Sequence, residues 1–147
     1  MEDLGQLVKL RREKLDEFRG MGISPYINRY HVNTTTASLF EKYSGMSKEE
    51  LDEKNSEYIT AGRMMSRRKH GKTTFVNIKD ASGDIQVFVN KNSLGESAYE
   101  IFGKFDIGDI IGVEGRISKT KTGELTLFSS KVTLLSKSLL PLPEKWH

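Results

Sequence analysis

The stretch "TTFVNIKDASGDIQVFVN", residues 73–90, contains two runs of alternating apolar and polar residues. In the first run, Val76 and Ile78 fall on the same face, because successive side chains of a strand point to opposite sides. The second run places three apolar residues on one face: Ile85, Val87 and Val89. Between the runs, "DASGD" at 80–84 has the composition of a tight turn. The stretch therefore predicts an antiparallel hairpin with one buried face.

The outer face of this hairpin carries an unexpected aromatic residue, Phe75, among polar neighbours. Gln86 and Phe88 lie on the outer face of the second strand. We expect Phe75 and Gln86 to share one solvent-exposed surface after pairing. An exposed ring stacks a nucleic-acid base with ~1–3 kcal/mol, and an amide pairs with a base edge. Burial of Phe75 under the N-terminal helices is the alternative.

The rest of the chain predicts helices first and strands afterwards. Helices are expected over 2–19 and around 36–43, and a third begins at the capping box of Ser47 and Glu50. The expected strands are 58–67, 72–79, 84–90, 109–119 and 124–135, with one helix over 94–105. In the last strand, the outward residues are Glu124, Thr126 and Phe128.

This order of elements favours a mainly β fold with helices: a five-stranded OB-fold Greek-key barrel preceded by N-terminal α-helices. Three strands, a helix and two further strands follow one another, as in that fold. An SH3-like barrel also has five short strands and is the alternative. "KTKTGE" at 119–124 and Gly71 are expected to form turns between strands.

Composition indicates an intracellular protein with a polyanionic partner. The chain has 147 residues, 36% of them hydrophobic and 29% charged, and no cysteine. It shows neither a signal peptide nor a membrane-spanning run, so a cytoplasmic location without a membrane partner is expected. Net charge is +3, but residues 58–79 contain six Lys or Arg and no acid. Such a cluster favours nucleic acid, the alternative being an ordinary solvated face.

Residues typical of catalysis are scarce. Gly71-Lys72-Thr73 resembles half of a phosphate-binding loop, but Ser66 stands where that motif has glycine, and the lysine opens a strand instead of a helix. The three histidines lack metal-ligand spacing. We expect no catalytic residue, no metal site and no cofactor in this chain.

Four segments carry a resemblance to a known family: "REKLDEFRGMGISPY", the strand pair with Phe75 and Gln86, "GDIIGVEGRISKTKTGELTLF" and "LLSKSLLPLPEKWH". They resemble the N-terminal anticodon-binding region of bacterial-type class II lysyl-tRNA synthetase. The resemblance implies an N-terminal helical extension at 1–56, an OB-fold anticodon-binding domain at 57–136 and, at 137–147, a linker toward a catalytic domain that this chain lacks.

The same resemblance implies roles for individual residues. Arg68, Phe75 and Gln86 match the family's spacing, which implies that Phe75 stacks on the central anticodon uridine and that Arg68 and Gln86 form hydrogen bonds to it. Glu124 aligns with a glutamate near the wobble-side base. The residues expected along the RNA backbone are Arg11, Arg12, Arg67, Lys69 and Lys72. His31 lies where relatives often have histidine, and no role is assigned to it.

Lysine tRNA is the partner that the resemblance implies. The full-length parent would be an ATP-dependent ligase using Mg²⁺ and forming a homodimer, whereas this segment alone is expected to be inactive and is compatible with a monomer. Two other functions remain open. One is a freestanding single-stranded nucleic-acid-binding OB protein, and the other is a protein-interaction module.

Overall fold

The computed structural model describes residues 4–20 and 30–138, and five strands in this part form a closed barrel. The strands are β1 (Glu57–His70), β2 (Thr73–Asp80), β3 (Gly83–Asn90), β4 (Ile110–Lys119) and β5 (Leu125–Ser136). Their order around the barrel is β1-β2-β3-β5-β4. Only the β3–β5 pairing is parallel, and the other four are antiparallel. The predicted five-stranded barrel is therefore confirmed.

The apolar faces of the strands fill the barrel interior, as their alternation predicts. Val76 and Ile78 of β2 are buried, as are Ile85, Val87 and Val89 of β3. Residues from β4 and β5 complete the same core, among them Ile111, Val113, Ile117, Leu127 and Leu134. The β2–β3 hairpin forms where expected, with Asp80 opposite Gly83. The face that remains outside the core is thereby fixed for every strand.

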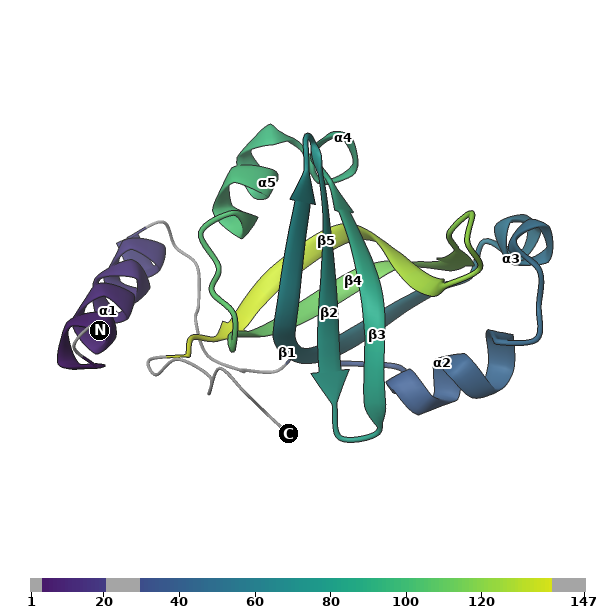
Figure 1. The fold of residues 1–147 in the computed structure, drawn as a ribbon, viewed down its shortest axis with the longest axis horizontal. Coiled ribbons are helices and arrows are strands. Elements are labelled where there is room, and N and C mark those ends of the chain that lie inside the picture. Colours follow the sequence, from purple (N-terminus) through teal and green to yellow (C-terminus); the bar gives the residue numbers. More distant parts are fainter. Residues whose placement is uncertain (1–3, 21–29, 139–147) are drawn as a thin grey trace.

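The helices lie at the margins of the β1–β2–β3 face and do not cross it (Figure 1). Their bounds are α1 (Leu4–Gly20), α2 (Thr36–Tyr43), α3 (Lys48–Lys54), α4 (Lys91–Leu94) and α5 (Glu96–Phe102). Among the described residues, no helix is both long and apolar enough to cross a membrane. The "PLPEKWH" tail lies outside the described residues.

Two predicted elements differ in extent from those observed. The helix expected over 94–105 begins only at Glu96 and ends at Phe102, because Gly95, with a φ of +93°, separates it from the short helix α4. Phe105, expected within this helix, follows it and is buried beside Phe102, with ring centroids 5.6 Å apart. Strand β1 reaches His70, three residues further than predicted, and Gly71 forms the turn with a φ of +60°.

The first residues of α2 are held by the β2–β3 hairpin. The Asp80 carboxylate accepts a hydrogen bond from the Thr36 backbone N–H at 2.9 Å and also binds Ser82. The Ser82 hydroxyl in turn accepts from the Ala37 N–H at 3.0 Å. Farther along the chain, α3 has the predicted capping box between Ser47 and Glu50. Both short helices are therefore fixed at their N-terminal ends, where unpaired backbone N–H groups need acceptors.

A buried ion-pair network ties α1 to the end of β5. Lys137 is almost fully buried and donates to Asp109 at 2.8 Å and to Asp106. Lys14 of α1 binds Asp106 from the other side at 2.9 Å. Burial alone would raise the pKa of Asp106, but the hydrogen bonds and charges of Lys137 and Lys14 bring it below its ordinary value. The network thus joins the first helix, the β4 approach and the last strand.

Candidate nucleic-acid interface

A row of five side chains runs around the barrel, with one residue from each strand. The strand register pairs Arg68 with Phe75, Phe75 with Phe88, Phe88 with Phe128, and Phe128 with Arg116. We call these five residues the aromatic row. Since directly paired residues of neighbouring strands point to the same side, the row is a product of register.

The three rings of the row touch one another. The centroids of Phe75 and Phe88 are 5.4 Å apart and edge-to-face, and those of Phe88 and Phe128 are 5.1 Å apart. The guanidinium carbon of Arg68 lies 5.5 Å from the centre of the Phe75 ring. At the other end, that of Arg116 lies 4.8 Å from the Phe128 ring. Each phenylalanine is only half-buried, so the row offers ring surface to a ligand.

One alternative from the sequence was that the N-terminal helices bury Phe75. The described helices do not cover it. Its outer face remains open, and its neighbours are aromatic as well as polar: Phe88 on one side and His70 at a centroid distance of 6.3 Å on the other. The sequence placed Phe88 on the same outer face but did not pair it directly with Phe75. The difference arises because register, which a single strand does not reveal, brings Phe88 directly opposite.

The prediction that Gln86 and Thr126 are solvent-exposed was wrong. Gln86 is only 8% exposed and Thr126 is fully buried. The parallel pairing of β3 with β5 places the two residues opposite each other, and the Gln86 Nε2 donates to the Thr126 Oγ1 at 3.0 Å. Arg68 Nη2 reaches the Gln86 Oε1 from above at 3.4 Å. Thr126 thus binds the nitrogen of the Gln86 amide, and Arg68 binds its oxygen.

The Thr126 hydroxyl is committed in turn, because it donates to the Glu124 carbonyl oxygen at 3.0 Å. Its oxygen can therefore accept from Gln86 but has no second hydrogen to give. Glu124 itself is exposed at the start of β5, next to the turn that Gly123 forms with a φ of +90°. The structure thus brings Arg68, Phe75 and Gln86 together, with Glu124 at the edge of the same surface.

Arg116 was not predicted as part of this surface, and α3 holds it there. Asp52 of α3 accepts from Arg116 Nη1 at 3.0 Å and from the Ser118 hydroxyl at 2.5 Å. Hydrogen bonds from Lys48, then Ser118 and Arg116, lower the pKa of Asp52 to about 2 against the opposing effect of burial. The sequence did contain a signal, since Glu114 and Arg116 alternate with the buried Val113 and Ile117.

The basic residues expected on the RNA backbone fall into two groups. Lys69 and Lys72 are exposed at the β1–β2 hairpin, and Arg67 donates to the Phe105 carbonyl oxygen at 2.6 Å. Arg11 and Arg12 lie on α1, and Arg11 hydrogen-bonds to Ser138 at 3.4 Å. His31 is exposed and outside the aromatic row. The structure groups the first three residues near Arg68 and leaves the two helical arginines with α1.

Chemically, the surface combines a stacking plane with directional hydrogen-bonding groups. Phe75 supplies the plane, and the Gln86 amide supplies one donor and one acceptor within reach of Arg68. Proteins read unpaired RNA bases in this way, by stacking them on aromatic rings and binding their Watson–Crick edges.

Comparison with known proteins agrees with this geometry. Residues 58–135 match the tRNA anti-codon family, described as an OB-fold nucleic acid binding domain. The chain belongs to this family. The matched segment begins in β1 and ends in β5, so it includes every strand of the barrel and the whole aromatic row. The OB-fold expected from the order of elements is thus confirmed.

Relatives of this OB-fold chain include several lysine–tRNA ligases. That of Pelotomaculum thermopropionicum is 47% identical over 146 residues, which is 99% of this chain and 28% of the ligase. Those of Enterococcus faecalis and Streptococcus pyogenes serotype M49 are 44% and 47% identical over 147 residues. The chain spans about 30% of the length of these relatives and corresponds to their N-terminal part. The resemblance noted in the sequence is confirmed.

Proposed function

We propose that this domain binds the anticodon loop of lysine tRNA, with the central base stacked on Phe75 and its edge bound by Gln86 and Arg68. One observation supports this most directly: Arg68 lies both over the Phe75 ring and within 3.4 Å of the Gln86 amide. A base on that ring would have hydrogen-bonding groups at its edge. The similarity to lysine–tRNA ligases supports the choice of tRNA.

The proposed selectivity for uridine follows from the order of groups on the base edge. At positions 4 and 3, uridine presents an acceptor and then a donor, whereas cytidine presents a donor and then an acceptor. An amide of fixed orientation can pair with only one of these orders at the same two positions. The hydrogen bond of Gln86 to Thr126 supplies the fixed orientation.

The neighbouring residues have supporting parts in this proposal. Glu124, exposed at the edge of the surface, would contact the wobble-side base. Arg67, Lys69 and Lys72 would meet phosphates, whose contribution to affinity falls as salt rises. Arg11 and Arg12 of α1 would lie along the anticodon stem.

We also propose that ligase activity belongs to a longer protein. The chain corresponds to about 30% of the length of its relatives. Lysine activation, with its ATP and Mg²⁺, and homodimer formation are therefore assigned to a region outside this segment. The longer protein would act in the cytoplasm. The 147 residues alone should not form lysyl-adenylate. Lysine-dependent exchange of pyrophosphate with ATP by the purified chain would contradict this.

The decisive experiment compares hairpins that differ only in the loop. We expect a hairpin with a central anticodon uridine to bind more tightly than the same hairpin with cytidine, and much more tightly than one with a scrambled loop. Equal affinity for all three would indicate sequence-tolerant single-strand binding on the three rings instead. Salt-independent binding, or none, would favour a protein-interaction module.

A further inference from the structure

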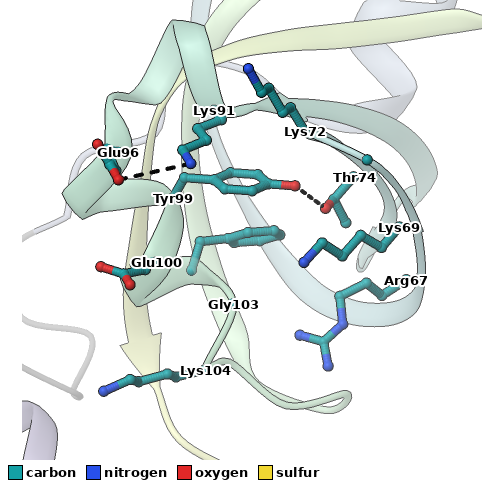
Figure 2. Close-up of a pocket in the computed structure, with 12 residues that line it drawn as sticks. Arg67, Lys69, Lys72, Thr74, Lys91, Glu96, Tyr99, Glu100, Gly103 and Lys104 are labelled. Carbon is teal, nitrogen blue, oxygen red and sulfur yellow. Dashed lines mark hydrogen bonds and ion pairs between the residues drawn. The ribbon is translucent and has the colours of Figure 1, made fainter.

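The β1–β2 hairpin has a second face, on the side opposite the aromatic row. Side chains alternate along β1, so Arg67 and Lys69 point away from the side on which Arg68 meets Phe75 and Gln86. On that other side, a cleft of about 540 Å³ separates the hairpin from α4 and α5. Figure 2 shows Arg67 and Lys69 directed toward α5.

Positive charge dominates the lining of this cleft. Two of the lining residues carry carboxylates, Glu96 and Glu100. Five carry positive charge: Arg67, Lys69, Lys72, Lys91 and Lys104. In Figure 2 both carboxylates lie on the far side of α5 from Lys69 and Arg67, and so does the ammonium group of Lys104. Within the described residues, no ion pair joins Lys69 or Lys72 to an acid. Lys69 and Lys72 therefore bring positive charge to the cleft that no ion pair with a described acid balances.

The walls of the cleft are fixed. The Tyr99 hydroxyl of α5 and the Thr74 hydroxyl of β2 are 2.7 Å apart, so a hydrogen bond ties the helix to the hairpin. Arg67 is held by the Phe105 carbonyl oxygen at 2.6 Å. On the other wall, Lys91 has Glu96 at 3.9 Å, a loose contact for an ion pair. The cations are thus arranged around a shaped space, not spread over a flat surface.

We propose that this cleft is a phosphate-binding site for the backbone of the RNA whose base is bound on the opposite face of the hairpin. The proposal rests on the proposed function and extends it to Lys91, which comes from a different part of the fold than the hairpin cations. Lysine ammonium groups act on phosphates as point charges without reading bases. The hairpin then separates two tasks: one face reads the base, and the other binds the RNA backbone.

The test measures hairpin affinity across a range of salt concentrations for wild type, Lys91→Gln and Lys131→Gln. Lys131 is a matched control, because it is exposed on β5, lies outside the cleft and also has a single carboxylate at 3.9 Å. Log affinity falls as log salt rises, and removing one phosphate contact makes this negative slope shallower by about 0.7. The ratio of wild-type affinity to Lys91→Gln affinity should therefore be about fivefold larger at 0.1 M salt than at 1 M salt. This change should be the same for hairpins with central uridine and with central cytidine.

A second arm separates RNA backbone from free phosphate compounds. Inorganic tripolyphosphate should displace the RNA hairpin from the wild-type protein. It should displace the RNA hairpin less effectively from the Lys91→Gln variant. An unchanged salt slope in Lys91→Gln, or an equal change in Lys131→Gln, would overturn the proposal. So would tripolyphosphate that binds as tightly to the hairpin complex as to the free protein. Failure of the proposed function reads out differently, as a loss of the distinction between uridine and cytidine in wild type.

Discussion

Gln86 and Thr126 lie opposite each other on two parallel strands, with 3.0 Å between the amide nitrogen and the hydroxyl oxygen. Because Thr126 gives its own hydrogen to the Glu124 carbonyl, it can only accept from Gln86. A rotated amide would set two acceptors against each other. Thr126 is therefore a positioning residue, which decides where Gln86 presents its donor and its acceptor.

The first prediction concerns the Thr126 hydroxyl. Thr126→Val keeps the side-chain shape and removes the hydroxyl, so the Gln86 amide is free to turn. We expect the affinity for a central uridine to fall by about 0.5–1.5 kcal/mol, the net value of a hydrogen bond, and the preference over cytidine to narrow. Hairpin titrations with both bases measure this.

Thr126→Ser is the matched control, since it retains the hydroxyl and should retain the preference for uridine. Thermal melts of both variants separate folding from recognition. If Thr126→Val and Thr126→Ser discriminate equally well, the hydroxyl does not orient the amide.

The second prediction concerns stacking on the aromatic row. Phe75→Ala should weaken binding by ~1–3 kcal/mol, almost independently of the base, because every base has a π-face. The ring is half-buried against Phe88, so some loss of stability is expected, but less than the ~3–5 kcal/mol of a truncated core phenylalanine. Binding titrations and denaturant unfolding give the two values. A loss confined to stability would show that the ring serves packing and not RNA.

The third prediction concerns Asp52 and acid. Its pKa is about 2 in the folded chain, below the ordinary value of about 3.9 in an unfolded one. A lowered folded pKa contributes stability above the unfolded value, and that contribution is lost as the pH falls from about 5 toward 2. Asp52→Asn should therefore be less stable than wild type at pH 7 and lose less stability on acidification.

Glu53→Gln, exposed on the same helix, is the control for the change in charge. The difference between its stability profile and that of wild type measures the effect of losing one acidic charge from this helix without the contacts of Asp52. Parallel profiles for Asp52→Asn and wild type would mean that the contacts of Asp52 with Lys48, Ser118 and Arg116 add no stability.

The fourth prediction uses the two ends of the ion-pair network. Lys137 is buried with Asp109, and removing one partner of a buried pair costs ~3–5 kcal/mol, because the other charge stays unpaired. Lys14→Met, at the more exposed end, should cost at most ~1 kcal/mol. Urea unfolding of Lys137→Met and Lys14→Met tests the difference. Similar losses would indicate that Lys137 reaches water when the pair is broken.

Local patterns in the sequence predicted much of this fold. Alternation in β2 and β3, the turn at residues 80–84 and the capping box of Ser47 are each encoded by neighbouring residues, and the structure has all three. Phe75 was identified as an outward ring for the same reason. Alternation in one strand reports which side a residue takes, whatever the partner strand.

Features that depend on distant segments were not predictable in this way. Burial of Gln86 needs β5, which lies 40 positions further along the chain and pairs in parallel. The place of Arg116 depends on Asp52, in a helix whose approach to β4 no local pattern specifies. The break at Gly95 was missed, because the apolar spacing of residues 94–105 is helical whether or not a glycine interrupts it.

Closure of the barrel by β5 has a consequence for the order in which the protein is made. The surface that would read a base combines residues from the middle of the chain with Thr126 and Phe128, which emerge from the ribosome about fifty residues after Phe75. A nascent chain that stops before β5 has its aromatic hairpin but neither the partner of Gln86 nor the third ring. Competence to recognise RNA should therefore arise abruptly, when the last strand joins, and not increase in steps as the chain grows.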